Sequence, residues 1–121
     1  MGIQTYMDDY VNWVKKETAI YRAGDYYEIT IPFLNEENDY LQFYAKLKGG
    51  KLQLTDDGYT VRRLEKPGFG IPEDKKQILE QTTKRYHVML QGNELTSYGS
   101  AKDFSSIIHS FIQCMIYVSC I

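Results

Sequence analysis

The stretch YYEITIPFLNEENDYLQFYAKLKGGKLQLT, from Tyr26 to Thr55, decides the fold. Apolar and polar residues alternate in three segments of it, and side chains of a strand point alternately to its two faces. The polar residues 35–39 and the pair Gly49-Gly50 separate the segments, and such residues favour tight turns. The stretch therefore predicts a three-stranded antiparallel meander with one aliphatic and aromatic face and one face of tyrosines and amides. Pro32 has no N–H for a neighbouring strand, so the first strand is expected to be an edge strand or to end there.

Helical spacing of apolar residues precedes and follows the meander. One stripe runs from Tyr6 to Tyr21, with Thr5 and Asp8 as a capping box and Gly24 as the stop. A terminal helix is expected after Ser100, and its predicted core stripe consists of Phe104, Ile107, Ile108, Phe111, Met115 and Val118. It remains apolar nearly all round to its end, which predicts that the end is buried or pairs with another chain.

Three smaller elements lie between the meander and the terminal helix. Residues 59–66 predict a short helix capped by Thr60, and residues 73–86 predict a longer one with acids first and bases last. Residues 87–98 predict a small second hairpin around Gly92-Asn93. The expected fold is one α+β domain spanning residues 1–121. In it the N-terminal and C-terminal helices pack on the three-stranded antiparallel meander, with the middle helix and the second hairpin beside them.

Composition restricts the classes of function. The 121 residues carry a net charge of −2, with 43% apolar and 25% charged residues, as in an ordinary globular domain. Acids and bases are interspersed, which argues against a direct nucleic-acid binder, because such proteins need a basic stripe to neutralise phosphates. Eleven tyrosines are present. A tyrosine buries its ring and keeps its hydroxyl in water, so the excess suits half-buried sheet faces and contact surfaces.

Three further observations indicate a cytoplasmic protein. Cys114 and Cys120 fall on different faces of the terminal helix, which predicts free thiols and no disulfide. Residues 1–10 are polar and do not resemble a signal peptide. Residues 107–121 are apolar but shorter than a membrane span, so we expect no membrane partner.

The triplet Asp56-Asp57-Gly58 follows the third predicted strand. Glycine adopts positive φ and aspartate accepts bonds from nearby backbone amides, so turn and helix-entry chemistry explains all three residues. A magnesium nuclease needs an acid on one strand and an acid-x-Lys pattern on the next, but Tyr44 stands two residues before Lys46. We therefore expect no metal, no cofactor and no catalytic activity.

Three ordered segments, Tyr26 to Tyr44, Leu54 to Phe69 and Ile107 to Val118, resemble a bacterial and phage family known as domain of unknown function 1828. The resemblance covers most of residues 6–118. The family has no established reaction, so the resemblance implies no catalytic residues. Its members often continue into a second domain, so this chain resembles a short stand-alone form. Such a form implies a phage or mobile-element product that acts in the cytoplasm of a bacterial host, and such elements are rich in inhibitors of host defences.

The predicted function is that of a non-catalytic module that binds another protein. In its specific form it is an anti-CRISPR-like inhibitor of a host defence nuclease. The acidic loops of this chain are expected to occupy the site where the nuclease binds nucleic-acid phosphates. The expected contact residues are Glu36, Glu37, Asp39, Tyr40, Tyr44, Asp56 and Asp57. One alternative is a magnesium-dependent nuclease or nuclease accessory domain that uses Glu28, Asp39 and Asp56. Another is a homodimeric interaction domain assembled through the terminal helix.

Overall fold

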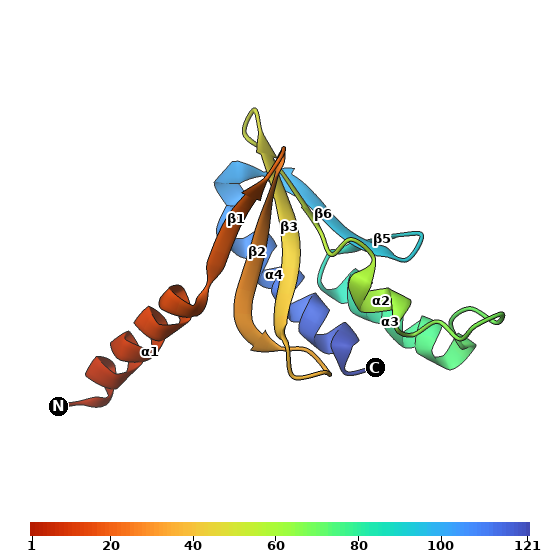
Figure 1. The fold of residues 1–121 in the computed structure, drawn as a ribbon, viewed down its shortest axis with the longest axis horizontal. Coiled ribbons are helices and arrows are strands. Elements are labelled where there is room, and N and C mark those ends of the chain that lie inside the picture. The colour runs from red at the N-terminus through yellow and green to blue at the C-terminus, as the bar shows by residue number, and fades with distance from the viewer.

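One six-stranded antiparallel sheet organises the chain. The computed structural model describes residues 1–121, and the strand order is β1-β2-β3-β4-β6-β5 (Figure 1). The strands are β1 (Ala19–Ala23), β2 (Tyr26–Leu34), β3 (Tyr40–Lys48), β4 (Lys51–Thr55), β5 (Met89–Gln91) and β6 (Glu94–Ser100). The helices are α1 (Ile3–Glu17), α2 (Tyr59–Arg62), α3 (Glu73–Arg85) and α4 (Phe104–Ser119), with a short 3₁₀ turn η1 (Ala101–Asp103) before α4.

The predicted meander is confirmed as β2, β3 and β4. Tyr44 of β3 pairs with Glu28 of β2 on one side and with Thr55 of β4 on the other. Gly49 and Gly50 turn the chain between β3 and β4 at φ 58° and 74°, values that side chains other than glycine rarely adopt. The predicted second hairpin is confirmed as β5 and β6, and β6 also pairs with β4, so the hairpin extends the same sheet. The α+β fold class is thus confirmed.

The prediction of one helix up to Tyr21 is wrong. The helix begins at Ile3, before Thr5, and ends at Glu17; Ala19–Ala23 then forms β1, paired antiparallel with β2. Gly24, at φ 64°, lies in the turn between these strands and does not end a helix. The apolar spacing of residues 19–23 fits a helix as well as a strand. Pairing with β2 makes the segment a strand, because tertiary contacts override the local pattern.

The edge-strand prediction from Pro32 is also corrected. β2 lies between β1 and β3, but β1 reaches only to Thr30. Its register with β3 shifts between Ile31 and Leu34, which marks a bulge at the proline. Pro32 is therefore tolerated because no ladder on the β1 side needs its N–H.

The core lies between the sheet and α4. Phe43 of β3 and Phe111 of α4 are fully buried, with ring centroids 5.6 Å apart. A Cβ at Gly99 of β6 would lie 2.4 Å from Cδ1 of Ile107, so this glycine lets α4 approach the sheet. Phe104 was predicted in the core stripe, but it sits at the first turn of α4 and is exposed.

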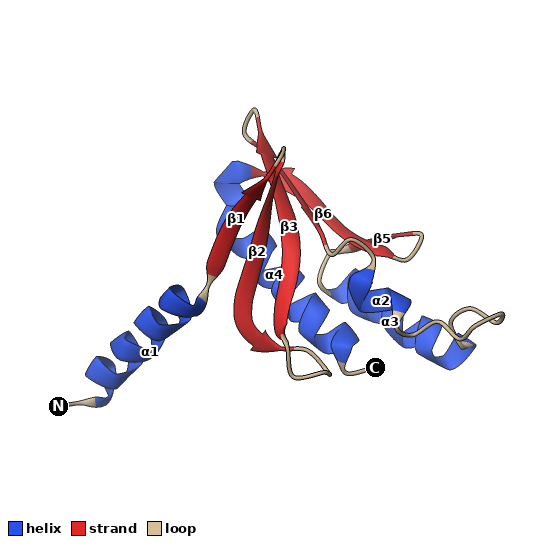
Figure 2. Ribbon diagram, viewed as in Figure 1, coloured by secondary structure: helices blue, strands red, loops and turns tan.

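The first helix departs from the predicted packing. α1 buries none of its residues, and Figures 1 and 2 show it projecting from the sheet, away from α2, α3 and α4. The expectation that it packs on the meander is therefore wrong. The sheet face opposite α4 is polar and rich in tyrosine, and Tyr40, Gln42 and Tyr98 on it are exposed.

Candidate functional site

Asp56 has a structural role. Its side chain is 1% exposed, and its Oδ1 accepts hydrogen bonds from the backbone N–H groups of Gly58 and Leu95, both at 2.9 Å. Its Oδ2 accepts from the N–H of Thr60 at 2.9 Å. One carboxylate thus caps α2, the role predicted for Thr60, and ties the helix to β6. The prediction of turn and helix-entry chemistry is confirmed here, and the contact role predicted for Asp56 does not fit its burial.

Asp57 adopts the opposite orientation. It is exposed, with φ 61°, and its N–H donates to Oγ1 of Thr55 at 2.9 Å. Its carbonyl accepts from Nη2 of Arg62 at 3.2 Å. Its carboxylate has no ion-pair partner within the chain. The two adjacent aspartates therefore have different roles. Asp56 stabilises the turn through its hydrogen bonds, and the carboxylate of Asp57 is exposed to solvent.

One cavity of about 460 Å³ brings the predicted contact residues together. All seven line it, although they come from two stretches, 36–44 and 56–57. The cavity exists because β4 ends at Thr55, opposite Tyr44, and leaves residues 40–43 of β3 without a strand on that side. The start of α2 and the end of α4 border the gap, and Met115 and Ser119 lie at its wall. This cavity is called the acidic pocket below.

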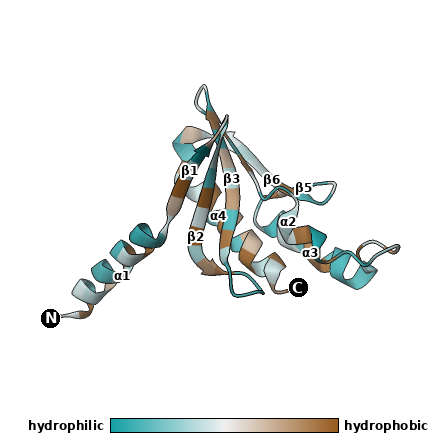
Figure 3. Cartoon of the chain, viewed as in Figure 1, coloured by the Kyte–Doolittle hydropathy of each residue, from teal (hydrophilic) through white to brown (hydrophobic).

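The loop 35–39 enters the acidic pocket in a fixed shape. Oδ1 of Asn35 accepts from the N–H groups of Glu37 at 2.8 Å and of Asp39 at 3.0 Å. The backbone N–H of Asn35 donates to the carbonyl of Asp39 at 2.8 Å, and Asn38 adopts φ 63°. Asparagine tolerates this left-handed conformation better than most residues. The two asparagines thus position the two carboxylates of Glu37 and Asp39, and Figure 3 shows the whole loop as hydrophilic.

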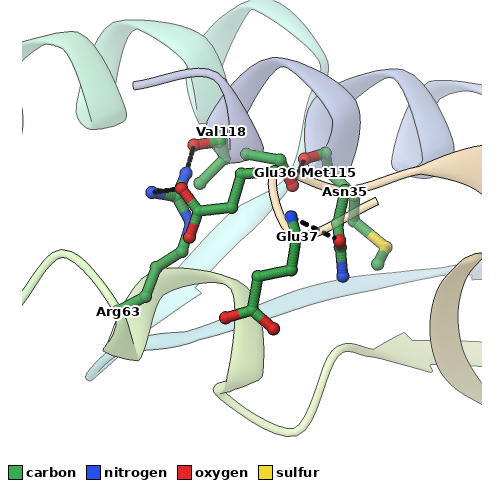
Figure 4. A network of polar contacts seen from close by, with 7 residues as sticks. Asn35, Glu36, Glu37, Arg63, Met115 and Val118 are labelled. Atoms are coloured by element: carbon green, nitrogen blue, oxygen red, sulfur yellow. Dashed lines mark hydrogen bonds and ion pairs between the residues drawn. The ribbon is translucent and has the colours of Figure 1, made fainter. Parts of the chain in front are cut away.

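Arg63 joins the loop to the rest of the site. Its Nη1 lies 2.9 Å from Oε2 of Glu36, and its Nη2 donates to the carbonyl of Val118 near the end of α4 (Figure 4). Glu37 points away from this pair and carries no ion pair. The sequence analysis missed Arg63 and its neighbour Arg62. Both arginines directly follow the turn at Asp56 to Gly58, and this position in the sequence could have indicated that they lie beside the predicted contact residues.

Five carboxylates and two guanidinium groups line the acidic pocket, a net charge of −3, whereas the whole chain carries −2. The negative charge is therefore concentrated at this site.

Two tyrosine hydroxyls border the pocket in the protonated form. Tyr40 donates to Oε1 of Glu17 at 3.0 Å, and this bond raises the pKa of Tyr40. Burial raises the pKa of Tyr44, and the charges of Glu28 and Asp57 raise it further. Both hydroxyls therefore remain hydrogen-bond donors at neutral pH. Tyr59, 68% exposed, adds a third ring that the sequence analysis did not select.

The carboxylates named for a nuclease are not arranged around one point. Asp56 already accepts three N–H groups, and Glu28 accepts from Nε2 of Gln42 at 2.5 Å and does not line the pocket. No group of three or more His, Cys, Asp or Glu residues is placed to hold a metal ion. The nuclease alternative stays a prediction, and calorimetric titration with magnesium tests it.

The terminal helix uses its apolar residues within the chain. Ile116 and Ile121 pack against the core, while Tyr117 is exposed. Both cysteines are free, as predicted, with Cys114 buried and Cys120 exposed. Burial raises the pKa of Cys114 to about 12, and the charge of Asp56 adds to the shift. None of the helices combines the length and the apolar character that a membrane crossing requires.

The comparisons with known proteins identify the family. The family model described as domain of unknown function DUF1828 matches residues 31–118, so the chain belongs to that family, as the sequence resemblance indicated. The match includes every predicted contact residue and begins within β2, after α1 and β1. No curated protein and no solved structure matches the chain.

Proposed function

We propose that this protein acts without catalysis, by binding stoichiometrically to a basic surface of another protein through the acidic pocket. The observation that supports the proposal is the convergence of acids and tyrosines from residues 36–44 and 56–59 on one cavity with a net charge of −3. A concave site with a concentrated charge favours a partner of opposite charge and speeds their encounter.

The chemistry of the rim suits lysine and arginine side chains. Glu37, Asp39 and Asp57 have no ion-pair partner within the chain, so a guanidinium group or an ammonium group can bind them without displacing an internal contact. The rings of Tyr40 and Tyr59 are exposed beside these carboxylates, and arginine stacks on aromatic faces. Arginine and tyrosine are also the residues that most often dominate the affinity of protein interfaces.

In its specific form, the proposal names a host defence nuclease, such as a CRISPR effector, as the partner. Proteins that bind nucleic acids place lysines and arginines where the phosphates lie. The carboxylates of the acidic pocket would occupy those positions and keep the nucleic acid out. The family assignment supplies no reaction that competes with this proposal, since the family is one of unknown function.

The decisive experiment measures target-DNA binding by candidate effector complexes with and without the protein. We expect the wild type to form a stable complex and to abolish DNA binding, and the variant E37K/D39K to lose both effects. The matched control is E73K/D74K, which makes the same charge change at exposed residues of α3 outside the pocket. A wild type that forms no complex with any effector removes the specific form of the proposal.

The general form is tested with an arginine-rich peptide by calorimetry. We expect one binding site per chain, with an affinity that falls as salt is added, because added ions screen exposed charges. E37K/D39K should weaken binding more than tenfold, about 1.4 kcal/mol, and E73K/D74K should not. Equal binding by the two variants would show that the peptide responds to net charge and not to the pocket.

A further inference from the structure

Helix α1 has an apolar side that the rest of the chain leaves mostly exposed. On this side Val14 is half-buried, and Glu17 at the C-terminal end accepts a hydrogen bond from the hydroxyl of Tyr40. The exposed apolar residues of α1, with exposed fractions from 47% to 77%, are Ile3, Tyr6, Met7, Tyr10, Val11 and Trp13. At 3.6 residues per turn they fall on one side of the helix. Six large side chains exposed side by side on one helix form the kind of contiguous apolar patch that marks an interaction site on a soluble protein.

The charged residues that border this side are arranged in two similar rows. Asp8 and Lys15, two turns apart, lie along one border, and Asp9 and Lys16 lie along the other. In both rows the acid is nearer the N-terminus and the lysine is nearer the C-terminus. If a second copy of the helix lies beside the first in the opposite direction, the acids of each row therefore face the lysines of the same row in the other copy.

We propose that α1 pairs antiparallel with α1 of a second copy of this chain. In a two-fold antiparallel pair each border faces the same border of the other helix. Asp8 then meets Lys15 of the second copy, and Asp9 meets Lys16 of the second copy. A parallel pair would instead place Asp8 against Asp9 and Lys15 against Lys16, which is repulsive.

This pairing also accounts for the apolar residues. Its midpoint falls near Asn12, so Tyr10, Val11 and Trp13 lie at the centre of the interface and are covered by the other helix. Ile3 and Tyr6 extend beyond the overlap and lie over β1 of the second copy, in a part of the chain where Ile20 is 63% exposed and Tyr21 is 66% exposed. The two exposed apolar surfaces of the N-terminal region are thus buried by one contact.

A membrane surface fits α1 less well than a second copy. Helices that lie on anionic membranes carry many lysines and arginines on the polar side. The polar side of α1 carries two aspartates and two lysines, so it has no net attraction for anionic headgroups.

Light scattering with chromatography is the test. We expect the wild type to have twice the monomer mass of 14.1 kDa. We expect D8K/D9K, with lysine at all four border positions, and K15D/K16D, with aspartate at all four, to be monomers. Each change should raise the dissociation constant more than about tenfold. An equimolar mixture of the two variants should recover the dimer mass, because every facing pair is then of opposite charge.

Two controls isolate the interface. The circular dichroism of both charge-reversal variants should match that of the wild type, because α1 buries no residue in the core. The pocket variant E37K/D39K should remain a dimer, so failure of the proposed function and failure of this inference are distinguishable. E73K/D74K on α3 should also remain a dimer.

Three results would overturn the inference. The first is a wild type of 14.1 kDa up to millimolar concentration, whether or not it binds anionic phosphatidylserine vesicles. The second is a dimer that both charge-reversal variants preserve, which would place the interface elsewhere, for example on α4. The third is a mixture of the two variants that stays monomeric, which would exclude the antiparallel arrangement.

Discussion

The first and last helices of the chain are of nearly equal length, 15 residues in α1 and 16 in α4. α4 buries Phe111, Cys114, Met115, Val118 and Ser119 against the sheet and its neighbours, whereas α1 buries nothing. Their sequences show why. α4 carries apolar residues along its core-facing side and nearly all round its C-terminal end, whereas in α1 they occupy one side, and several of them are tyrosine or tryptophan.

The difference between the two helices indicates that α4 stabilises the fold, whereas α1 is available for association with another chain. α4 and the sheet supply the buried apolar surface that stabilises the fold, so changes there should affect the free energy of unfolding. α1 supplies exposed aromatic surface beside charges, so changes there should affect association. The predictions below test this division, beginning with the largest expected effect.

Cysteine reactivity should differ most between the two helices. Because the pKa of Cys114 rises from 9.0 to about 12, its thiolate fraction at pH 8 should be about a thousandfold lower than normal. Iodoacetamide at pH 8 should therefore label Cys120 and leave Cys114 free, as mass spectrometry of the digest will show. In N12C, which places a thiol on the exposed polar side of α1, the new thiol should react like Cys120. Equal labelling of Cys114 would mean that α4 opens readily.

Truncation of the core should cost the most stability. F111A removes a fully buried ring that packs on Phe43, and we expect a loss of about 4 kcal/mol in the free energy of unfolding. Urea denaturation followed by circular dichroism measures it. A loss below about 1 kcal/mol would contradict the assignment of α4 to the core.

The two neighbouring aspartates should respond differently to the same change. D56N replaces one acceptor oxygen by an amide group that faces a backbone N–H donor, so we expect a loss of about 2 kcal/mol. D57N should stay within about 0.5 kcal/mol, because the side chain is exposed and asparagine tolerates positive φ. The same denaturation experiment compares them, and equal losses would refute the division between capping and exposed acid.

The smallest effect is expected in α1. W13A should change the free energy of unfolding by less than about 0.5 kcal/mol when it is measured at dilutions where the chain is monomeric, since Trp13 is 47% exposed and outside the core. At high concentration the same variant should unfold more easily than the wild type, because association stabilises the folded chain. Loss of stability at all dilutions would show that α1 packs on its own sheet.

The elements that could be predicted from the sequence are those whose residue pattern fits only one type of secondary structure. Alternation in residues 26–55 fits strands and not helices, and Gly49-Gly50 fits a tight turn, so the meander could be predicted. Residues 19–23 could not, because Ile20 and Tyr21 continue the spacing of α1 and only pairing with β2 makes them a strand. That β6 joins the sheet beside β4 depends on a long-range pairing that no local pattern encodes.

The candidate site was predicted in its composition and not in its geometry. The acids and tyrosines were chosen because they cluster near turns, and the structure places all of them around one cavity. The sequence could not show that Asp56 turns inward, because its three donors include the N–H of Leu95 on a distant strand. The role of Arg63 was hidden for the same reason, since its partners lie in loop 35–39 and at the end of α4.

The hydrogen bonds of Asn35 have a thermodynamic consequence for recognition. A loop that moves freely loses conformational entropy when a partner immobilises it, and that loss weakens binding. In loop 35–39 the side chain of Asn35 already holds the backbone at Glu37 and Asp39 before any partner arrives. The acids of this loop are held in place, so the proposed partner would meet charges that need no reorganisation. In the proposed complex Asn35 would thus contribute to affinity through order alone, even where it touches no atom of the partner.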